Sequence, residues 1–323
     1  MKLSIKHLIL FIGMIAGSNT CFCNTNHLNV TNKASSPIKY TNKSNIVLDG
    51  LTIDCNNEKV PGIQLHFCSN IYIKNCKISN SLFYGIKLYN CTNITIENCF
   101  ITNVQAGVYA QESKTIKVNN NQFLNMNGPY PSGNFVQFDN VNGGGNRINY
   151  NKCENIAGVA KHPQDGLSVY KSNGLPGDSI QVIGNWIRGG QISHDSGGAC
   201  GIGLGDNGGS YQVVRYNILV NPGYVGIQPQ GGTHIKVDHN TIYSSRTPVS
   251  LLGLSRGNAS DKPSSDVYIG YNMVNWTDFN GNNAPSNCAW YDPKTETPLG
   301  WETNKLAAPV DSTVLPRTII TMK

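Results

Sequence analysis

The feature that most constrains this chain is an internal repeat with a period of about 23 residues. The segments "NIYIKNCKI" from Asn70, "NITIENCFI" from Asn93 and "TIKVNNNQF" from Thr115 are short alternating strands, whose first isoleucines are Ile71, Ile94 and Ile116. Later copies read "SIQVIGNWI", "HIKVDHNTI" and "DVYIGYNMV". Self-similarity at this spacing indicates a repeat protein, in which each unit stacks on its neighbours.

A second series of short strands lies between these copies. It comprises "GIQLHF" from Gly62, "GIKLYN" from Gly85, "GVYAQE" from Gly107, "GLSVYK" from Gly166, "GIGLGD" from Gly201 and "GIQPQG" from Gly226. In each, residues two and four are apolar and residues three and five can point outward, so every repeat holds at least two strands. Leucine-rich repeats of similar length would need a regular leucine scaffold, which is absent. The sequence predicts an all-β fold, a single-stranded parallel β-helix (solenoid) with terminal caps, in which Asn75 and Asn98 form one ladder.

The chain's ends differ in composition from the repeat. Residues 1–23 begin with Lys2 and Lys6, continue through an apolar stretch too short to span a bilayer, and end in small residues, which is typical of a secretory signal peptide. We expect 24–44 to be a leader or N-terminal cap, 45–275 the β-helix, and 276–323 a C-terminal cap or tail. The predicted product is secreted or periplasmic, with no membrane span.

The cysteines follow the repeat. Cys68 and Cys91 are separated by one full period, and so are Cys76 and Cys99, which puts each pair on neighbouring coils. Disulfides and stacked free thiols are both compatible with this spacing. Cys288 in the tail could likewise bond to Cys200 or stay free. No cysteine or histidine cluster has zinc-like spacing.

The strands and turns quoted above resemble those of right-handed parallel β-helix proteins of the pectate-lyase-like superfamily, more narrowly the bacterial exported β-helix repeat proteins of largely unassigned activity. The resemblance covers roughly Asn45 to Val274. It implies right-handed coils and a carbohydrate ligand, because members of that superfamily are lyases, hydrolases or epimerases of acidic polysaccharides, or bind glycans without cleaving them.

The coils lengthen in the middle of the repeat. The first position of each strand in the second series, usually glycine, falls at Gly107, Phe135, Gly166, Gly201, Gly226 and Pro248. The intervals between these positions widen as far as Gly201 and then narrow again. The added segments include "GPYPSG", "NIAGVAKHPQD" and "RGGQISHDSGGAC". Since the core path of each repeat is fixed, these insertions should leave as neighbouring loops and border a groove.

Outward positions beside these loops carry few bulky side chains, which would let a sugar chain approach closely. The predicted substrate-binding residues are Asp139, Ser168, Tyr170, Gly203, Gly205, Gln228 and Gln230. One position further, Lys171 and Asp206 are expected in the same column, either as part of a site or as an ordinary surface ion pair.

The candidate catalytic residues are Lys171, Arg188, His194, Asp165 and Asp206. Lys171 followed by Arg188 resembles the Lys base and Arg partner of β-helix alginate and chondroitin lyases. In that reading Lys171 removes a proton, Arg188 neutralises charge, and Asp165 or Asp206 tunes Lys171 or holds a cation such as Ca²⁺. His194 is an alternative proton carrier.

The favoured function is therefore β-elimination of an acidic polysaccharide. Two alternatives remain open. The first is a non-catalytic glycan-binding or surface-structural protein, in which Tyr170, Gln228 and Gln230 serve binding alone. The second is a glycoside hydrolase using Asp165 with Asp206 or Asp195. Loss of Lys2 and Lys6 would lower the formal net charge from +6 to +4, and no motif for binding nucleic acid is present.

Overall fold

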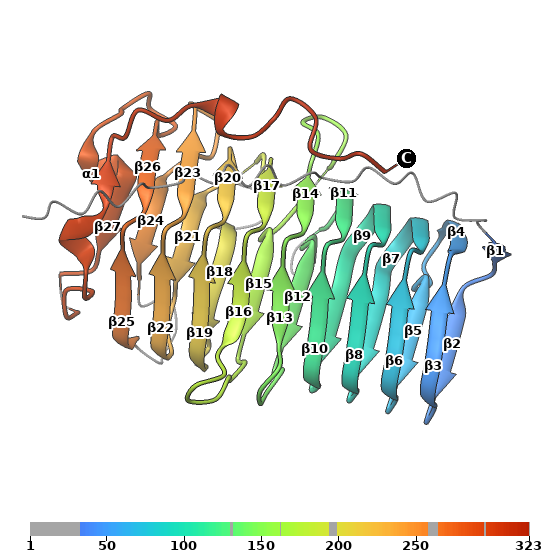
Figure 1. The fold of residues 1–323 in the computed structure, drawn as a ribbon. Helices are drawn as coiled ribbons and strands as arrows, with labels where there is room; N and C mark the ends of the chain where they lie inside the picture. The colour runs from blue at the N-terminus through green and yellow to red at the C-terminus, as the bar shows by residue number, and fades with distance from the viewer. Residues whose placement is uncertain are drawn as a thin grey trace, which may run out of the picture. The chain divides into compact units, whose positions relative to one another are not determined.

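The computed structural model describes residues 33–129, 132–161, 163–193, 199–257, 264–293 and 295–322. Within these residues the chain forms parallel strands that recur coil after coil in three rows (Figure 1). No helix in these ranges is long and apolar enough to cross a membrane. The predicted all-β, parallel β-helix fold is confirmed.

Row 1 and row 2 belong to one sheet, because β7 and β9 continue from one row into the other. Row 1 contains β1 (Lys33–Ser35), β4 (Leu51–Glu58), β7 (Lys77–Tyr89), β9 (Phe100–Gln111), β11 (Gln122–Met126), β14 (Lys152–Glu154), β17 (Trp186–Arg188), β20 (Ile218–Val220), β23 (Thr241–Ser244), β26 (Met273–Trp276) and β28 (Lys305–Leu306). Row 2 contains β2 (Ile38–Thr41), β5 (Ile63–His66), the ends of β7 and β9, β12 (Val136–Asp139), β15 (Leu167–Tyr170), β18 (Cys200–Asp206), β21 (Val225–Pro229), β24 (Leu252–Arg256) and β27 (Ala289–Tyr291).

Row 3 forms a separate sheet. It contains β3 (Ser44–Asp49), β6 (Ser69–Lys74), β8 (Thr92–Glu97), β10 (Lys114–Asn119), β13 (Arg147–Asn149), β16 (Ile180–Ile183), β19 (Ser210–Arg215), β22 (Thr233–Asp238) and β25 (Ser265–Gly270). The described residues also form the short helices α1 (Pro285–Cys288), η2 (Trp301–Thr303) and η3 (Ser312–Val314).

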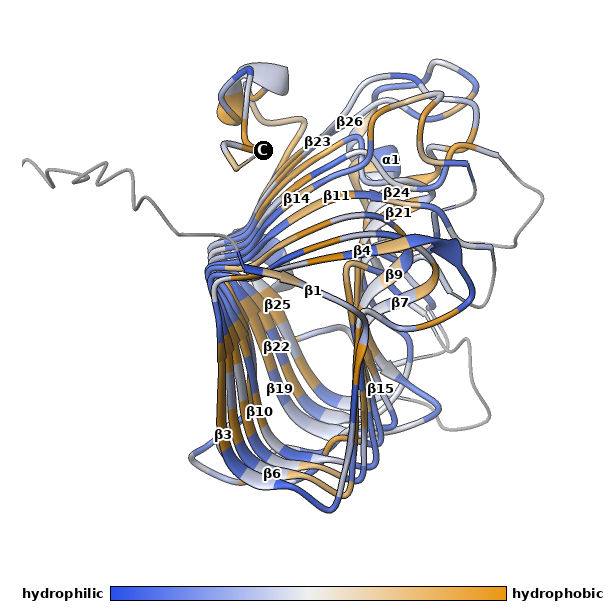
Figure 2. Ribbon diagram, turned by 90° about the vertical axis from the view of Figure 1, so that its right-hand side faces the viewer, coloured by the Kyte–Doolittle hydropathy of each residue, from blue (hydrophilic) through white to orange (hydrophobic). Residues whose placement is uncertain are grey.

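The register follows the sequence repeat. Ile71 pairs with Ile94 and Ile94 with Ile116, and all three are buried. Apolar positions of successive coils consequently line one interior, as the orange bands in Figure 2 show. Asn75 and Asn98 occupy equivalent corners with φ of 53°, a left-handed conformation that asparagine tolerates better than most residues. Asn75 Nδ2 donates to Asp49 Oδ1 at 2.8 Å.

A ladder of hydrogen-bonded asparagines lies inside the corner between rows 3 and 1. Its members are Asn121, Asn151, Asn185, Asn217, Asn240, Asn272 and Asn304, and each Nδ2 donates to the Oδ1 of the next at 2.8 to 3.1 Å. In earlier coils cysteine takes this column, because the Cys99 N–H donates to Asn121 Oδ1. The ladder satisfies backbone groups that would otherwise be buried without partners.

All eight cysteines among the described residues are buried free thiols. Of the two arrangements compatible with the sequence, the structure therefore shows free thiols, and Cys76 and Cys99 each donate to backbone carbonyls. Cys288 is also free, and its Sγ accepts the Ala307 N–H at 3.4 Å. Cys21 and Cys23 lie outside the described residues.

Strand pairing extends on both sides of residues 45–275, since β1 and β2 pair with β4 and β5, and β27 and β28 pair with β24 and β26.

One repeat position differs from the sequence-based expectation. The placement of the first strand position at Pro248 is wrong, because Val225 pairs with Leu252 and Ile227 with Leu254. Hydrogen bonds between Thr247 and Ser250 form an extra turn before β24, so this position belongs to Gly253.

The C-terminal residues 307–322, here called the C-terminal strap, run back along row 1 (Figure 1). Asn275 Nδ2 donates to the Val310 carbonyl at 2.7 Å near the start of this segment. Leu315 and Ile319 then bury themselves against Val220. At the far end the Gln122 side chain bonds to the backbone and hydroxyl of Thr321. The C-terminal strap thus lies along the coils of row 1.

Candidate functional site

The candidate site lies on the outer face of row 2 in the middle coils. The long insertions connect β11 to β12, β14 to β15 and β17 to β18, so each leaves row 1 and enters row 2. The register places Ser168 opposite Gly203 and Gly203 opposite Gln228. These three positions form one column, but Ser168 and Gly203 are buried, so the expectation of an exposed bare floor at these two positions is wrong.

A β-bulge shifts the next column. Val169 pairs with Leu204 but Tyr170 pairs with Asp206, so Gly205 is the extra residue. Its φ of 61° suits glycine, and a Cβ there would lie 2.1 Å from the Gly231 carbonyl oxygen. The predicted Lys171–Asp206 column is therefore wrong by one residue, because alternation alone does not reveal a bulge.

Lys171 belongs to the corner that follows β15. Its N–H donates to the Asp206 carbonyl at 3.0 Å, while its Nζ lies 4.9 Å from the centroid of the Tyr170 ring. The Tyr170 hydroxyl accepts a hydrogen bond from Asn207 Nδ2 at 3.1 Å. The lysine side chain is exposed and rests on an aromatic face.

Asp165 precedes β15 and is partly exposed. Its Oδ1 accepts the Cys200 N–H at 2.6 Å, and a Cβ on Gly203 would lie 3.4 Å from its Oδ2. Burial raises the pKa of Asp165 to about 6, and the charge of Asp206 acts in the same direction. A side chain at position 203 would contact this second carboxylate oxygen, and glycine avoids that contact.

Asp206 provides a second carboxylate on the neighbouring coil. Burial raises its pKa, while a hydrogen bond from the Asn207 backbone and the charge of Lys171 oppose that shift. Asp165 and Asp206 are thus two partly exposed carboxyl groups that influence each other electrostatically. Pairs of this kind, with raised pKa values in one face, are typical of acid–base sites.

A buried thiol connects the amides of the site. Cys200 Sγ donates to Gln228 Oε1 at 3.1 Å and accepts from Gln230 Nε2 at 3.4 Å. Gln228 Nε2 in turn donates to Ser255 Oγ at 3.3 Å. Burial raises the pKa of Cys200 well above its usual range, so the group is a neutral thiol. The two glutamines predicted to bind sugar are therefore held by protein partners.

One neighbouring polar group has no partner. Asn134 lies one coil before Asp165, since Phe135 and Gly166 are bonded neighbours. Its Oδ1 is buried and accepts no hydrogen bond within the described part of the chain. A buried polar atom without a partner costs free energy, and the same holds for Thr52, Gln105 and Trp276 elsewhere among the described residues.

The structure does not bring Arg188 to Lys171. Arg188 ends β17 in row 1, where it forms an ion pair with Glu154 at 3.1 Å. Its guanidinium also donates to the carbonyls of Pro316 and Arg317 in the C-terminal strap, at 2.6 and 3.0 Å. The sequence pattern put Arg188 on the right coil but could not show that row 1 faces away from row 2.

Three further residues predicted for the site are Asp139, His194 and Asp195. Asp139 lies on the row 2 face, and its Oδ2 accepts the Tyr109 hydroxyl at 2.6 Å. His194 and Asp195 fall outside the described residues. In the part of the chain that the structure describes, no three His, Cys, Asp or Glu side chains are grouped to hold a metal ion.

The sequence analysis did not assign Cys200, Asn134 or Ser255 to the site. Ser255 could have been assigned, because aligning Gly253 with Gly226 places Ser255 beside Gln228. Cys200 and Asn134 carried no such signal, because they precede the alternating part of their strands.

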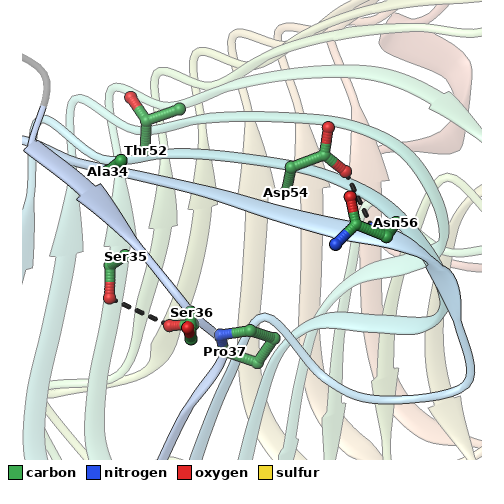
Figure 3. Close-up of a pocket in the computed structure, with 7 residues that line it drawn as sticks. All are labelled: Ala34, Ser35, Ser36, Pro37, Thr52, Asp54 and Asn56. Carbon is green, nitrogen blue, oxygen red and sulfur yellow. Dashed lines mark hydrogen bonds between the residues drawn. The ribbon is translucent and has the colours of Figure 1, made fainter.

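A shallow depression of about 410 Å³ lies away from this face, at the first described coil (Figure 3). Its lining is small and polar, consisting of Ala34, Ser35, Ser36, Pro37, Thr52, Asp54 and Asn56. In it, Asp54 accepts the Asn56 backbone N–H at 2.9 Å. The depression shares no residue with the row 2 site.

Comparison with known proteins agrees with the fold. The family model described as "Right handed beta helix region" matches residues 13–141. No curated protein matches the chain. The matched part of the sequence and the three rows of parallel strands together identify the chain as a right-handed parallel β-helix protein.

Proposed function

We propose that this β-helix hydrolyses an acidic polysaccharide on the outer face of row 2, with Asp165 as general acid and Asp206 as general base. The observation that carries the proposal is the pair of carboxyl groups on adjacent coils, Asp165 before β15 and Asp206 at the end of β18, which are near enough for the charge of Asp206 to raise the pKa of Asp165. Both have pKa values raised by burial.

Hydrolysis of a glycosidic bond needs one carboxyl group that donates a proton and one carboxylate that activates water. Asp165, with a pKa of about 6, retains its proton in mildly acidic solution and can deliver it to the departing oxygen. Asp206 also responds to the nearby charge of Lys171, which favours its ionised form. The same side chain can then accept a proton from the attacking water.

β-Elimination is the second candidate. The observation that favours this reaction is the position of Lys171 near Asp206. Lys171 could act as the base that removes the proton in the elimination. The proposed partner Arg188 is engaged by Glu154 and the C-terminal strap in another row. Elimination would therefore need another group to neutralise the uronate carboxylate, and a protonated Asp165 is the nearest choice.

The test is product analysis with alginate, pectate, hyaluronan, chondroitin and glucuronan, with and without Ca²⁺. Hydrolysis releases new reducing ends without the ultraviolet absorbance of an unsaturated sugar. Asp165→Asn and Asp206→Asn should each lower the rate by about a hundredfold or more. Asp266→Asn is the matched control, because Asp266 is an exposed carboxylate in row 3.

An ultraviolet-absorbing product that disappears in Lys171→Ala would replace hydrolysis by elimination. Retention on one immobilised glycan without any new chain end would instead identify a binding protein.

A further inference from the structure

We propose that the first coils of row 2 carry an aromatic platform that binds an anionic sugar unit of the chain cleaved at Asp165 and Asp206. The platform consists of Phe67, Phe83, Tyr84, Lys87 and Tyr109. The proposal rests on the proposed function for its substrate, but the platform itself is a binding site that can be measured without cleavage.

The aromatic rings of the platform are ordered by mutual contact. The Tyr84 and Tyr109 rings stack with centroids 4.9 Å apart at an interplanar angle of 13°, and Phe83 lies 4.3 Å from Tyr84. The Tyr109 hydroxyl donates to Asp139, which fixes the orientation of the stacked pair. Rigid aromatic surfaces bind sugar rings with little loss of side-chain entropy.

A cation sits on these rings. Lys87 Nζ lies 5.3 Å from the centroid of Phe83 and 5.5 Å from that of Tyr84. Lys39 belongs to the same outward column two coils earlier, because Lys39 pairs with Gln64 and Gln64 with Lys87. Among the described residues, no carboxylate lies within ion-pair distance of Lys39 or Lys87.

The nearby carboxylates are already engaged. Asp139 accepts from Tyr109, and a hydrogen bond to Glu112 raises the pKa of Tyr89. Burial and the charges of Lys87 and Lys39 lower the pKa of His66, which favours its neutral form. The platform therefore presents uncompensated positive charge, which suits a carboxylate or sulfate on a sugar.

Backbone conformation singles out the edge of the same surface. Phe67 has φ of 54° and is 50% exposed, at a corner where the two adjacent coils have Asn42 and Asn90. Later coils have Glu112, Asn140 and Lys171 at this corner, also with positive φ. A bulky residue in this conformation is strained, and half of Phe67 remains exposed. Its ring contacts Tyr89 at 5.6 Å in an edge-on arrangement, which widens the aromatic surface.

The platform and the carboxyl pair share one strand row. Tyr109 pairs with Gln137, Gln137 with Ser168, and Ser168 with Gly203. At about 4.8 Å per coil, Tyr109 and Gly203 are separated by about 14 Å. One oligosaccharide lying along the helix axis can span this distance, with its anionic unit on the platform and the scissile bond at the carboxyl pair.

The experiment measures binding of oligogalacturonate and of sulfated chondroitin oligosaccharides by calorimetry, using the Asp206→Asn variant, in which cleavage is slowed. Lys87→Met should weaken binding of an anionic hexasaccharide about tenfold. Tyr84→Ala should weaken it to a similar extent. Lys77→Met is the matched control, because Lys77 is on the same strand β7 but in row 1. A neutral maltohexaose should bind more weakly and show no dependence on Lys87.

Equal binding by Lys87→Met and Lys77→Met would overturn the platform, and so would loss of binding in Lys77→Met alone. A response to sulfated but not carboxylated chains would identify the anion as sulfate. If Lys87→Met hydrolyses chains of every length at the normal rate, the platform proposal is wrong and the proposed function stands. If binding depends on Lys87 but no cleavage is detected, the platform proposal stands and the proposed hydrolase activity is wrong.

Discussion

At the scale of single residues, Asp165 links the pH dependence of stability to that of function. Its folded pKa of about 6 lies above the value near 3.9 expected in an unfolded chain. Between these values the folded protein binds more protons than the unfolded one, so stability declines as pH rises from about 4 to 6. Above that window the contribution of this group is constant.

We expect Asp165→Asn to remove this decline. The wild type should lose up to about 3 kcal/mol of unfolding free energy across the window relative to the variant. The measurement is chemical unfolding at several pH values, and an identical pH dependence in both proteins would contradict the shifted pKa. In the active enzyme, kcat/KM should fall as pH rises through about 6, because the acid must be protonated.

At the scale of the structural element, the buried asparagine ladder joins the coils independently of the strands. Asn185 illustrates how many groups one member serves. Its Oδ1 accepts from both the backbone and the Nδ2 of Asn151, and its own Nδ2 donates to Ile148 and Asn217. Each bond satisfies a group that has no access to water.

Asn185→Ala should therefore cost about 2–4 kcal/mol, since several buried groups lose their partners together. Asn283→Ala, at an exposed loop position, should cost less than about 1 kcal/mol. Thermal or chemical unfolding of both variants checks the difference. Equal effects would mean that the ladder contributes no more than a surface amide.

Elements also show how far the sequence could predict the molecule. The fold was predictable because every coil repeats the same apolar alternation, and Ile71, Ile94 and Ile116 report its register directly. The site was less predictable because it depends on departures from that alternation. The bulge at Gly205 moved Asp206 opposite Tyr170, and Arg188 lay in a different row from Lys171. Periodicity describes the core and says little about side chains at corners.

At the scale of the whole molecule, the described coils are held by the C-terminal strap as well as by strand pairing. The strap buries Leu315 and Ile319 against row 1, and Arg188 bonds to two of its carbonyls. Row 1 is thereby occupied by the protein's own chain, while the outer face of row 2 carries the proposed site.

We expect a chain ending at Ala308 to lose about 3–6 kcal/mol of unfolding free energy, because two apolar side chains and several hydrogen bonds are removed. Arg188→Ala should cost about 2 kcal/mol, partly by leaving Glu154 without its partner. Both variants should keep the row 2 activity under conditions where they remain folded. Loss of turnover in a fully folded Arg188→Ala protein would return Arg188 to the catalytic site.

Repeat arrays normally interact only with their nearest neighbours, so they can lose units one at a time from an end. The bond between Gln122 and Thr321 connects positions 199 residues apart in sequence. This long-range contact links the C-terminal end of the chain to β11, so the strap cannot detach completely without losing a contact on β11. Local unfolding of the C-terminal strap and of the coil that contains β11 should therefore be cooperative.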